Sequence, residues 1–369
     1  MLKIPSSYED SRTRFCGYLP SLKKLYPAPQ LDSRQIPHPD DDDLTIDILH
    51  ADASGRKERL FVLSTGLHGI EGYVGAVMMQ LFVEEYLPKF DPATTGVLLI
   101  HAINPWGMKH RRRVNPNNVD LNRNFNTDTA KLAEVNPTYK KLSPFLNPQK
   151  PLNNHIWAQI SFLGGVVSNL LKYSVSSIRE ATLMGQYHTP HGIYHGGADV
   201  QAETKTMMSI LRTYLTDYAQ IVHLDMHTGY GPRYGMTLVN STFEPMNAQQ
   251  TATKFNYQRV AATNPEEFYT IHGDMMDYVY EIASDKKIYA AAFEFGTYGD
   301  SLWDAIHSLR SSIVENQAFW HGASDSAKAW VAQEYRELFM PTEAAWLEKA
   351  IKDAHEAFTG ILGNLDYLT

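Results

Sequence analysis

The sequence predicts an α/β fold. Apolar runs of strand length alternate with stretches of helical periodicity, first at 59–65, 71–86 and 97–101. This strand–helix–strand order favours a crossover connection and strands that are at least partly parallel. No internal repeat, linker or change of composition marks a boundary, so we expect a single domain over residues 1–369.

The composition is that of an ordinary globular protein, with 43% hydrophobic and 20% charged residues and a net charge of −8. A broad basic surface for nucleic acid or an anionic membrane is excluded. Cys16 is the only cysteine, so the chain has no internal disulfide and suits a reducing compartment. The N-terminus lacks the apolar core of a signal peptide, and no apolar run approaches the roughly 20 residues of a membrane span. We therefore expect a cytoplasmic protein that binds neither nucleic acid nor membrane; the oligomeric state is left open.

The first third of the chain supplies the expected centre of the sheet. In order, the patterns predict a helix over 6–25, a proline- and aspartate-rich connection over 30–43, strands over 44–50 and 59–65, a helix over 71–86 and a strand over 97–101. The acidic run 40–43 lies beside prolines and is typical of a solvated loop.

The rest of the chain is more irregular at first and then regular again. A polar loop spans 104–124, and the stretch 127–199 shows little periodicity apart from a helical piece near 156–172. Within it, the loop 185–197 carries His188, His191 and His195, which fit a metal site or a substrate-facing loop. The remaining patterns predict a helix over 198–218, strands over 220–226 and 236–240, helices over 247–262 and 274–284, a strand over 287–293, and helices over 301–316 and 325–359.

Polar residues follow four of the apolar strands at the point where each strand ends. They are His68 with Glu71, the loop that reaches Arg123, His227 and Glu294. In open α/β sheets, ligands bind in the crevice outside the carboxyl ends of the strands. The sequence therefore predicts that these side chains form a site.

The residue types indicate a metal site. His68 and Glu71 lie three residues apart on a strand–helix turn, where an imidazole and a carboxylate could share a zinc ion, and His227 would complete the set. Three protein ligands leave the fourth position for water, whose pKa a metal lowers from about 15.7 to about 7. His223 also competes as a ligand, but it lies inside the strand and is expected to be a hydrogen-bonded core histidine.

Three further residues have the chemistry that such a site requires. Glu294 could take the proton from water and pass it to the leaving group. Arg113 could stabilise a developing oxyanion, although the sequence does not decide between it and the adjacent Arg112. Asp120 could accept the other ring N–H of a ligand histidine and so fix its tautomer.

The ordered set of motifs resembles the zinc carboxypeptidase superfamily, including its succinylglutamate desuccinylase and aspartoacylase branch. The motifs lie between residues 68 and 297: His68-Gly-Ile-Glu71, Arg113, Asp120-Leu-Asn122-Arg123-Asn-Phe125, His227-Thr-Gly and Phe293-Glu294-Phe. The Asn-Pro-Trp-Gly and Arg-Arg-Val-Asn segments and the Gly-Gln-Tyr…Gly-Gly loop look most like a bacterial group known only as a domain of unknown function. The resemblance implies a three-layer α/β/α sandwich around a mixed, largely parallel eight-stranded sheet.

The resemblance also implies roles for individual residues. His68, Glu71 and His227 would hold one zinc ion, and Glu294 would be the general base and acid. Asn122 and Arg123 would clamp a substrate carboxylate, for which a planar guanidinium is suited; Arg113 would polarise the scissile carbonyl, and Tyr269 would match the mobile tyrosine of carboxypeptidases. The same ligands also accept Ni²⁺ or Co²⁺.

The chain departs from the superfamily in one spacing, because His227 follows Glu71 by more residues than is usual. We therefore expect the middle segment, 127–199, to shape or cover the pocket.

Three functions remain open at this point. The first is a zinc exopeptidase or amidase that cleaves next to a free carboxylate. The second is a deacylase of N-acyl amino acids. The third is a non-catalytic binding protein with an inherited pocket.

Overall fold

The computed structural model of the protein describes residues 2–126, 132, 135–262 and 272–369. Eight strands form one sheet in the order β1-β2-β4-β3-β5-β8-β6-β7. Their bounds are β1 (Gln30–Gln35), β2 (Thr45–Ala51), β3 (Arg59–Thr65), β4 (Thr95–His101), β5 (Gln220–Thr228), β6 (Met236–Asn240), β7 (Val260–Ala261) and β8 (Lys287–Phe295). The four central strands, in the order β4-β3-β5-β8, are parallel to one another, and β6 is parallel to β7. The pairs β1-β2, β2-β4 and β6-β8 are antiparallel. The expected mixed, largely parallel sheet is confirmed.

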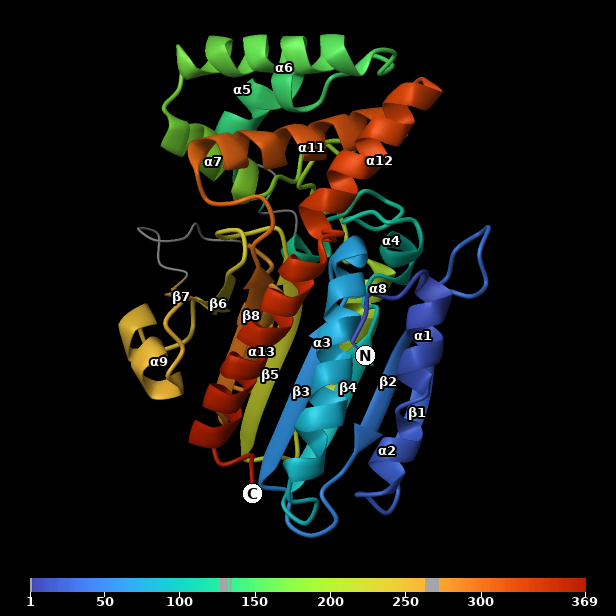
Figure 1. Ribbon diagram of the computed structural model, residues 1–369, viewed down its shortest axis with the longest axis vertical. Helices are drawn as coiled ribbons and strands as arrows, with labels where there is room; N and C mark the ends of the chain where they lie inside the picture. The colour runs from blue at the N-terminus through green and yellow to red at the C-terminus, as the bar shows by residue number, and fades with distance from the viewer. Residues whose placement is uncertain (1, 127–131, 133–134, 263–271) are drawn as a thin grey trace.

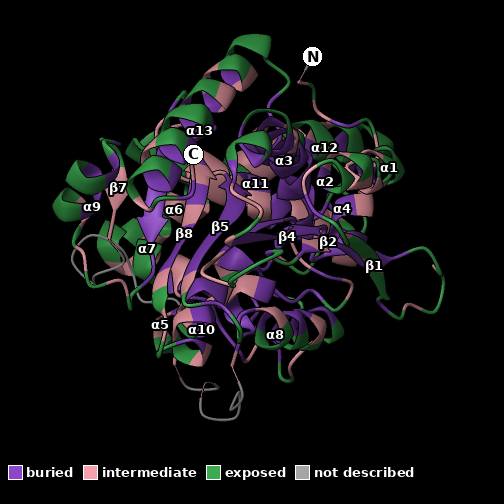
Figure 2. Ribbon diagram, turned by 90° about the horizontal axis from the view of Figure 1, so that it is seen from below, coloured by how far each residue is buried: buried purple, intermediate pink, exposed green. Residues whose placement is uncertain are grey.

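Helices cover both faces of this sheet (Figures 1 and 2). On one face α1 (Tyr8–Cys16), α3 (Gly72–Glu85), α9 (Ala248–Phe255) and α13 (Ala344–Asn364) pack on one set of strand residues, among them Phe61 and Leu63. On the other face α8 (Ala202–Tyr214) and α10 (Met275–Ile282) pack on the alternate set, among them Leu60 and Val62. Because successive side chains of a strand point to opposite faces, each central strand is apolar throughout and separates two cores.

A group of helices lies beyond the carboxyl ends of β5 and β8, at the top of Figure 1. It comprises α5 (Pro137–Leu146), α6 (His155–Leu170) and α7 (Val175–Leu183) from the middle segment, with α11 (Leu302–His321) and α12 (Asp325–Phe339). α5, α6, α7 and α11 share a separate small core that includes Tyr139, Leu142, Phe162 and Ile313. In the part of the chain that the structure describes, no helix has both the length and the apolar character to cross a membrane.

Four predicted elements differ from the structure. The connection predicted over 30–43 contains β1, a polar and exposed edge strand without a hydrophobic pattern. The helix predicted over 6–25 ends at Cys16, and α2 (Leu19–Lys23) begins separately with Pro20 in its first turn. The helix predicted over 247–262 ends at Phe255, because Asn256 adopts the left-handed conformation. The pattern over 325–359 is two helices, since Pro341 between them cannot continue a helix.

The end of β4 carries a buried histidine, His101. Its Nε2 lies 2.8 Å from Ser11 Oγ, and its ring stacks on Phe15. Burial lowers the pKa of His101 to about 4, and the folded protein therefore holds the ring neutral well below pH 6.

We expect His101 to make the fold sensitive to acid. His101 is protonated near pH 6.5 in the unfolded chain but only near pH 4 in the folded chain. The free energy of unfolding should therefore decrease as the pH falls from about 6.5 to about 4, by at most about 1.4 kcal/mol per pH unit. Urea titrations across this range should give a shallower slope for His101→Gln than for the unmodified protein. Equal slopes would contradict the prediction, because any loss of metal in acid affects both proteins alike.

Candidate metal centre

The turn after β3 places His68 and Glu71. The chain passes from β3 through Gly66, whose φ of 75° favours glycine, into a short 3₁₀ turn over Gly69–Glu71. Gly69 lies against α4 (Pro105–Lys109), where a Cβ would sit only 2.1 Å from the carbonyl carbon of Gly107. The amides of Gly69 and Ile70 donate to carbonyls of the following loop at 3.1 and 2.9 Å. The turn is therefore fixed by backbone contacts, and it directs both polar side chains beyond the strand end.

Three donor groups meet there. His68 Nδ1 lies 3.0 Å from Glu71 Oε1, and His227 Nδ1 lies 3.2 Å from Glu71 Oε2. The two Nδ1 atoms are 3.2 Å apart, and all three side chains are buried. Among the described residues this is the one His/Cys/Asp/Glu group with ligand atoms close enough to hold a metal ion. The structure thus brings together the three residues that the sequence predicted as ligands.

The other nitrogen of each imidazole faces an aspartate. His68 Nε2 lies 3.1 Å from Asp120 Oδ1, and His227 Nε2 lies 2.6 Å from Asp225 Oδ2. Hydrogen bonds of this kind orient histidine ligands and leave the opposite nitrogen to bind a metal. Both Nδ1 atoms are therefore presented on the same side, toward Glu71.

Asp225 was missed in the sequence. It lies two residues before His227 in β5, and an even offset in a strand puts both side chains on one face. Ser64 Oγ donates to Asp225 Oδ1 at 2.7 Å and lies 2.8 Å from His223 Nε2. His223 is thus a hydrogen-bonded core histidine, as predicted, and an acidic residue at even spacing inside a buried strand was the available signal for Asp225.

The charge around this group is unbalanced without a cation. With neutral histidines, three carboxylates (Glu71, Asp120 and Asp225) stand against two guanidinium groups (Arg113 and Arg123), and Glu294 adds negative charge whenever it is ionised. Burial alone would lower the pKa of His227, yet the nearby carboxylates raise it well above its usual value. The excess of negative charge and the converging donors both fit a divalent metal ion.

The two adjacent arginines face different partners. The guanidinium of Arg113 pairs with Asp120, and its Nε lies 3.6 Å from Glu71 Oε1. Arg112 instead pairs with Glu315, with Nε to Oε1 at 2.6 Å, and its guanidinium lies over the ring of Phe319. Arg113 is therefore the one of the two that reaches the candidate metal centre.

Asn122 and Arg123, the two residues expected to clamp a carboxylate, also contact different partners. Arg123 pairs with Asp120 and donates to the carbonyl of Leu183 at 2.6 Å, while its buried Nε has no hydrogen-bond partner among the described residues. The Asn122 amide donates to Asp274 and its oxygen accepts from the Met275 amide at the start of α10. Both polar atoms of the Asn122 side chain are thus hydrogen-bonded to Asp274 and Met275 at the start of α10. Of the two residues, Arg123 is the one whose Nε–H has no acceptor among the described residues.

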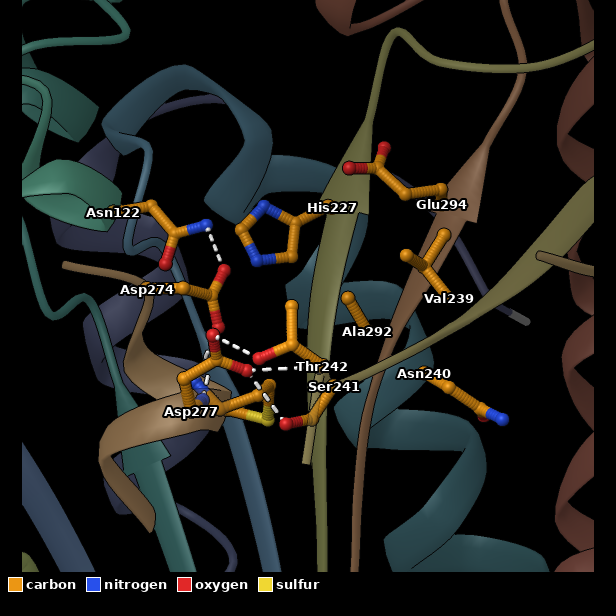
Figure 3. Close-up of a pocket in the computed structure, with 11 residues that line it drawn as sticks. Asn122, His227, Val239, Asn240, Ser241, Thr242, Asp274, Asp277, Ala292 and Glu294 are labelled. Atoms are coloured by element: carbon orange, nitrogen blue, oxygen red, sulfur yellow. Dashed lines mark hydrogen bonds between the residues drawn. The ribbon is translucent and has the colours of Figure 1, made fainter. Parts of the chain in front are cut away.

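Glu294 lies one residue before the end of β8, beside His227, its partner in the register with β5. In Figure 3 the two side chains extend from neighbouring strands at a small cavity of about 50 Å³. Glu294 Oε2 is buried and has no hydrogen-bond partner among the described residues. Burial raises the pKa of Glu294 to about 7, partly opposed by the charge of His227. This carboxylate is available to exchange a proton near neutral pH.

A cavity of about 610 Å³ adjoins the metal centre. Its lining includes His68, Glu71, Arg113, Arg123 and Glu294, together with residues of α5, α6, α7 and α11. Three of these helices belong to the middle segment, which therefore forms part of the cavity wall.

Two further predictions from the sequence concern Tyr269 and the histidine-rich loop over 185–197. Tyr269 lies outside the described residues. None of the three loop histidines belongs to the metal centre. His188 Nδ1 lies 2.8 Å from Thr189 Oγ1, and the ring of His191 stacks on Trp320. The backbone carbonyl of His195 accepts from the Asp120 amide at 2.7 Å. The histidine-rich loop therefore holds the segment of Asp120 in place.

Comparison with known proteins gives one family and several similar folds. The solved structures to which the chain is similar include bovine thrombin-activatable fibrinolysis inhibitor in complex with tick carboxypeptidase inhibitor, at 12% identity over 88% of this chain and 97% of that chain, with a TM-score of 0.47. They also include carboxypeptidase A from Helicoverpa armigera, at 14% identity over 96% and 74% with a TM-score of 0.47, and a succinylglutamate desuccinylase from Silicibacter sp. TM1040, at 16% identity over 80% and 67% with a TM-score of 0.39. No curated protein sequence matches the chain.

A family model does match, and it covers nearly the whole chain. The model is described as a protein of unknown function, DUF2817, and spans residues 6–353. The expected relationship to a group known only as a domain of unknown function is confirmed. The chain belongs to the DUF2817 family.

Proposed function

We propose that this protein is a zinc-dependent hydrolase that cleaves an amide bond next to a free carboxylate. The observation that carries the proposal is the convergence of two imidazole Nδ1 atoms and both Glu71 oxygens, at 3.0–3.2 Å, beside the buried Glu294 carboxylate, whose Oε2 has no partner among the described residues. Donors of this type and number are those of catalytic zinc sites.

His68, Glu71 and His227 would hold the ion, and Asp120 and Asp225 would fix the two imidazole rings. When bound, zinc supplies Lewis acidity, which activates water at neutral pH and polarises a carbonyl. The donor set also accepts Ni²⁺ or Co²⁺.

Glu294 would move the proton. As a carboxylate it accepts a proton from the attacking water, and as a carboxylic acid it donates that proton to the departing amine nitrogen. A group with a pKa near the working pH can do both, and burial gives Glu294 such a pKa.

Two arginines would bind the substrate. Arg113 lies at the metal centre, where its guanidinium could stabilise the negative charge that develops on the carbonyl oxygen. Arg123 lines the same cavity, and its Nε–H, which has no acceptor among the described residues, suits a substrate carboxylate. Asn122 is assigned to holding α10 rather than to this clamp.

Matched substrate pairs test the carboxylate requirement. We expect N-acyl amino acids or peptides with a free carboxylate to be hydrolysed, and the corresponding carboxamides to react at least about 100-fold more slowly in kcat/KM, since a charge-assisted hydrogen bond is lost and Arg123 is left without its partner. Product release measured by amine-reactive fluorescence reports both members of each pair. Equal rates would remove the carboxylate clamp from the proposal.

The same panel separates the two hydrolase alternatives. Cleavage of N-acyl amino acids without cleavage of peptides would identify a deacylase, and the reverse would identify an exopeptidase. No turnover of any member by the metal-loaded protein would favour a binding protein.

A further inference from the structure

The 610 Å³ cavity has a polar part and an apolar part. The polar part is the metal centre with Arg113, Arg123 and Glu294. The apolar part is formed by helices of the middle segment and by α11, with Phe145, Val166, Leu170, Ile178, Ile306 and Leu309. The cavity has a volume typical of sites for drug-sized ligands. It is therefore larger than hydrolysis of a small acyl group at the metal centre would require.

The apolar wall is supported from behind. Phe145, Val166, Ile178, Ile306 and Leu309 pack on the small core of α5, α6, α7 and α11 yet remain only partly buried. Phe145 stacks on the buried Phe162 with ring centroids 5.5 Å apart. Gly165 permits this packing, because a Cβ there would lie 2.5 Å from the Phe145 ring. The wall is therefore a formed surface whose uncovered side faces the cavity.

The cavity also opens through apolar residues. Leu170, Val175 and Leu302 line it and are 38%, 43% and 50% exposed. The charged residues Arg179, Arg259 and Asp300 line it as well, so the cavity as a whole has an amphiphilic lining. Exposed aliphatic side chains next to a large cavity are typical of a site for an apolar ligand.

We propose that the substrate is an N-acyl amino acid with a medium or long linear acyl chain. The acyl chain would lie against Val166, Leu170 and Ile306, while the amide reaches the metal centre and the carboxylate reaches Arg123. This inference rests on the proposed hydrolase function. Water adds its hydroxyl to the acyl carbon, the C–N bond breaks, and the proton goes to the nitrogen, which releases a fatty acid and a free amino acid.

A chain-length series tests the inference. With one amino acid and acyl chains of two, six, ten and fourteen carbons, kcat/KM should rise by up to about fourfold per methylene until the wall is covered. Val166→Phe fills the cavity and Leu170→Asp places a charge on the wall. Both should lower the ratio of kcat/KM for the decanoyl to the acetyl substrate by at least about tenfold. Val167→Asp is the matched control, because Val167 is 61% exposed on the same helix and does not line the cavity.

The outcomes separate this inference from the function on which it rests. Hydrolysis of the acetyl substrate with a flat series would overturn the acyl-chain site and leave the hydrolase proposal intact. If no substrate reacts, binding of dodecanoate is measured by calorimetry. Binding that Val166→Phe abolishes and Val167→Asp preserves would support the site, although the hydrolase proposal would fail. Neither binding nor turnover would overturn both.

Discussion

Glu294→Gln is expected to lower kcat by about 10²–10⁴-fold without removing the metal or the fold. The carboxamide has the size of the carboxylate but cannot accept the proton from water, and general base catalysis contributes a factor of this order. Glu294 Oε2 has no hydrogen-bond partner among the described residues, so replacing this oxygen breaks no hydrogen bond there. The measurements are kcat on the best substrate of the panel, the metal content and the melting temperature.

Glu203→Gln is the matched control for this variant. Glu203 is also a buried glutamate whose pKa burial raises, but it lies on α8, where Asn115 donates to it, and it does not line the cavity. Its replacement should leave kcat unchanged. If Glu294→Gln retained full activity, Glu294 would not be the base, and another proton acceptor would have to be sought around the metal centre.

The sequence predicted the sheet and the position of the site because both depend on local patterns. Apolar runs such as 59–65 and 220–226 are long enough to mark buried strands. A polar residue directly after such a run, like His227, has to lie at the strand end, where the sheet has its crevice. These inferences need no knowledge of which elements pack together.

What the sequence left open depends on tertiary partners. Arg112 and Arg113 are adjacent and chemically identical, and only the packing of α11, which brings Glu315 to Arg112, separates them. Asn122 has the residue type of a substrate clamp, but it is bound by the start of α10, about 150 residues later in the chain. The edge strand β1 has no hydrophobic pattern of its own and is defined by its pairing with β2. None of these contacts has a local signal.

Replacement of either histidine ligand is expected to abolish metal binding. We expect about one divalent ion per chain in the purified protein, and almost none in His68→Ala or His227→Ala. Either substitution removes one of three ligands and leaves the buried carboxylates uncompensated. Elemental analysis after dialysis measures the ion. Full occupancy in both variants would eliminate the site.

Asp225→Asn and His101→Gln give this measurement a graded scale. Asparagine at 225 can still contact His227 Nε2 but no longer carries the charge that strengthens the ring as a ligand, so we expect metal affinity to fall by about 10–100-fold rather than to vanish. His101 is equally buried and also ends a sheet strand, but it has no place in the donor group, so His101→Gln should bind the ion as the unmodified protein does. Metal occupancy should therefore decrease from His101→Gln to Asp225→Asn to His227→Ala.

The melting temperature should follow the same order under saturating metal, because an ion that binds the folded state stabilises it in proportion to the logarithm of its concentration over Kd. A general loss of packing would not produce this dependence on metal concentration, and that distinguishes a lost ligand from a damaged fold.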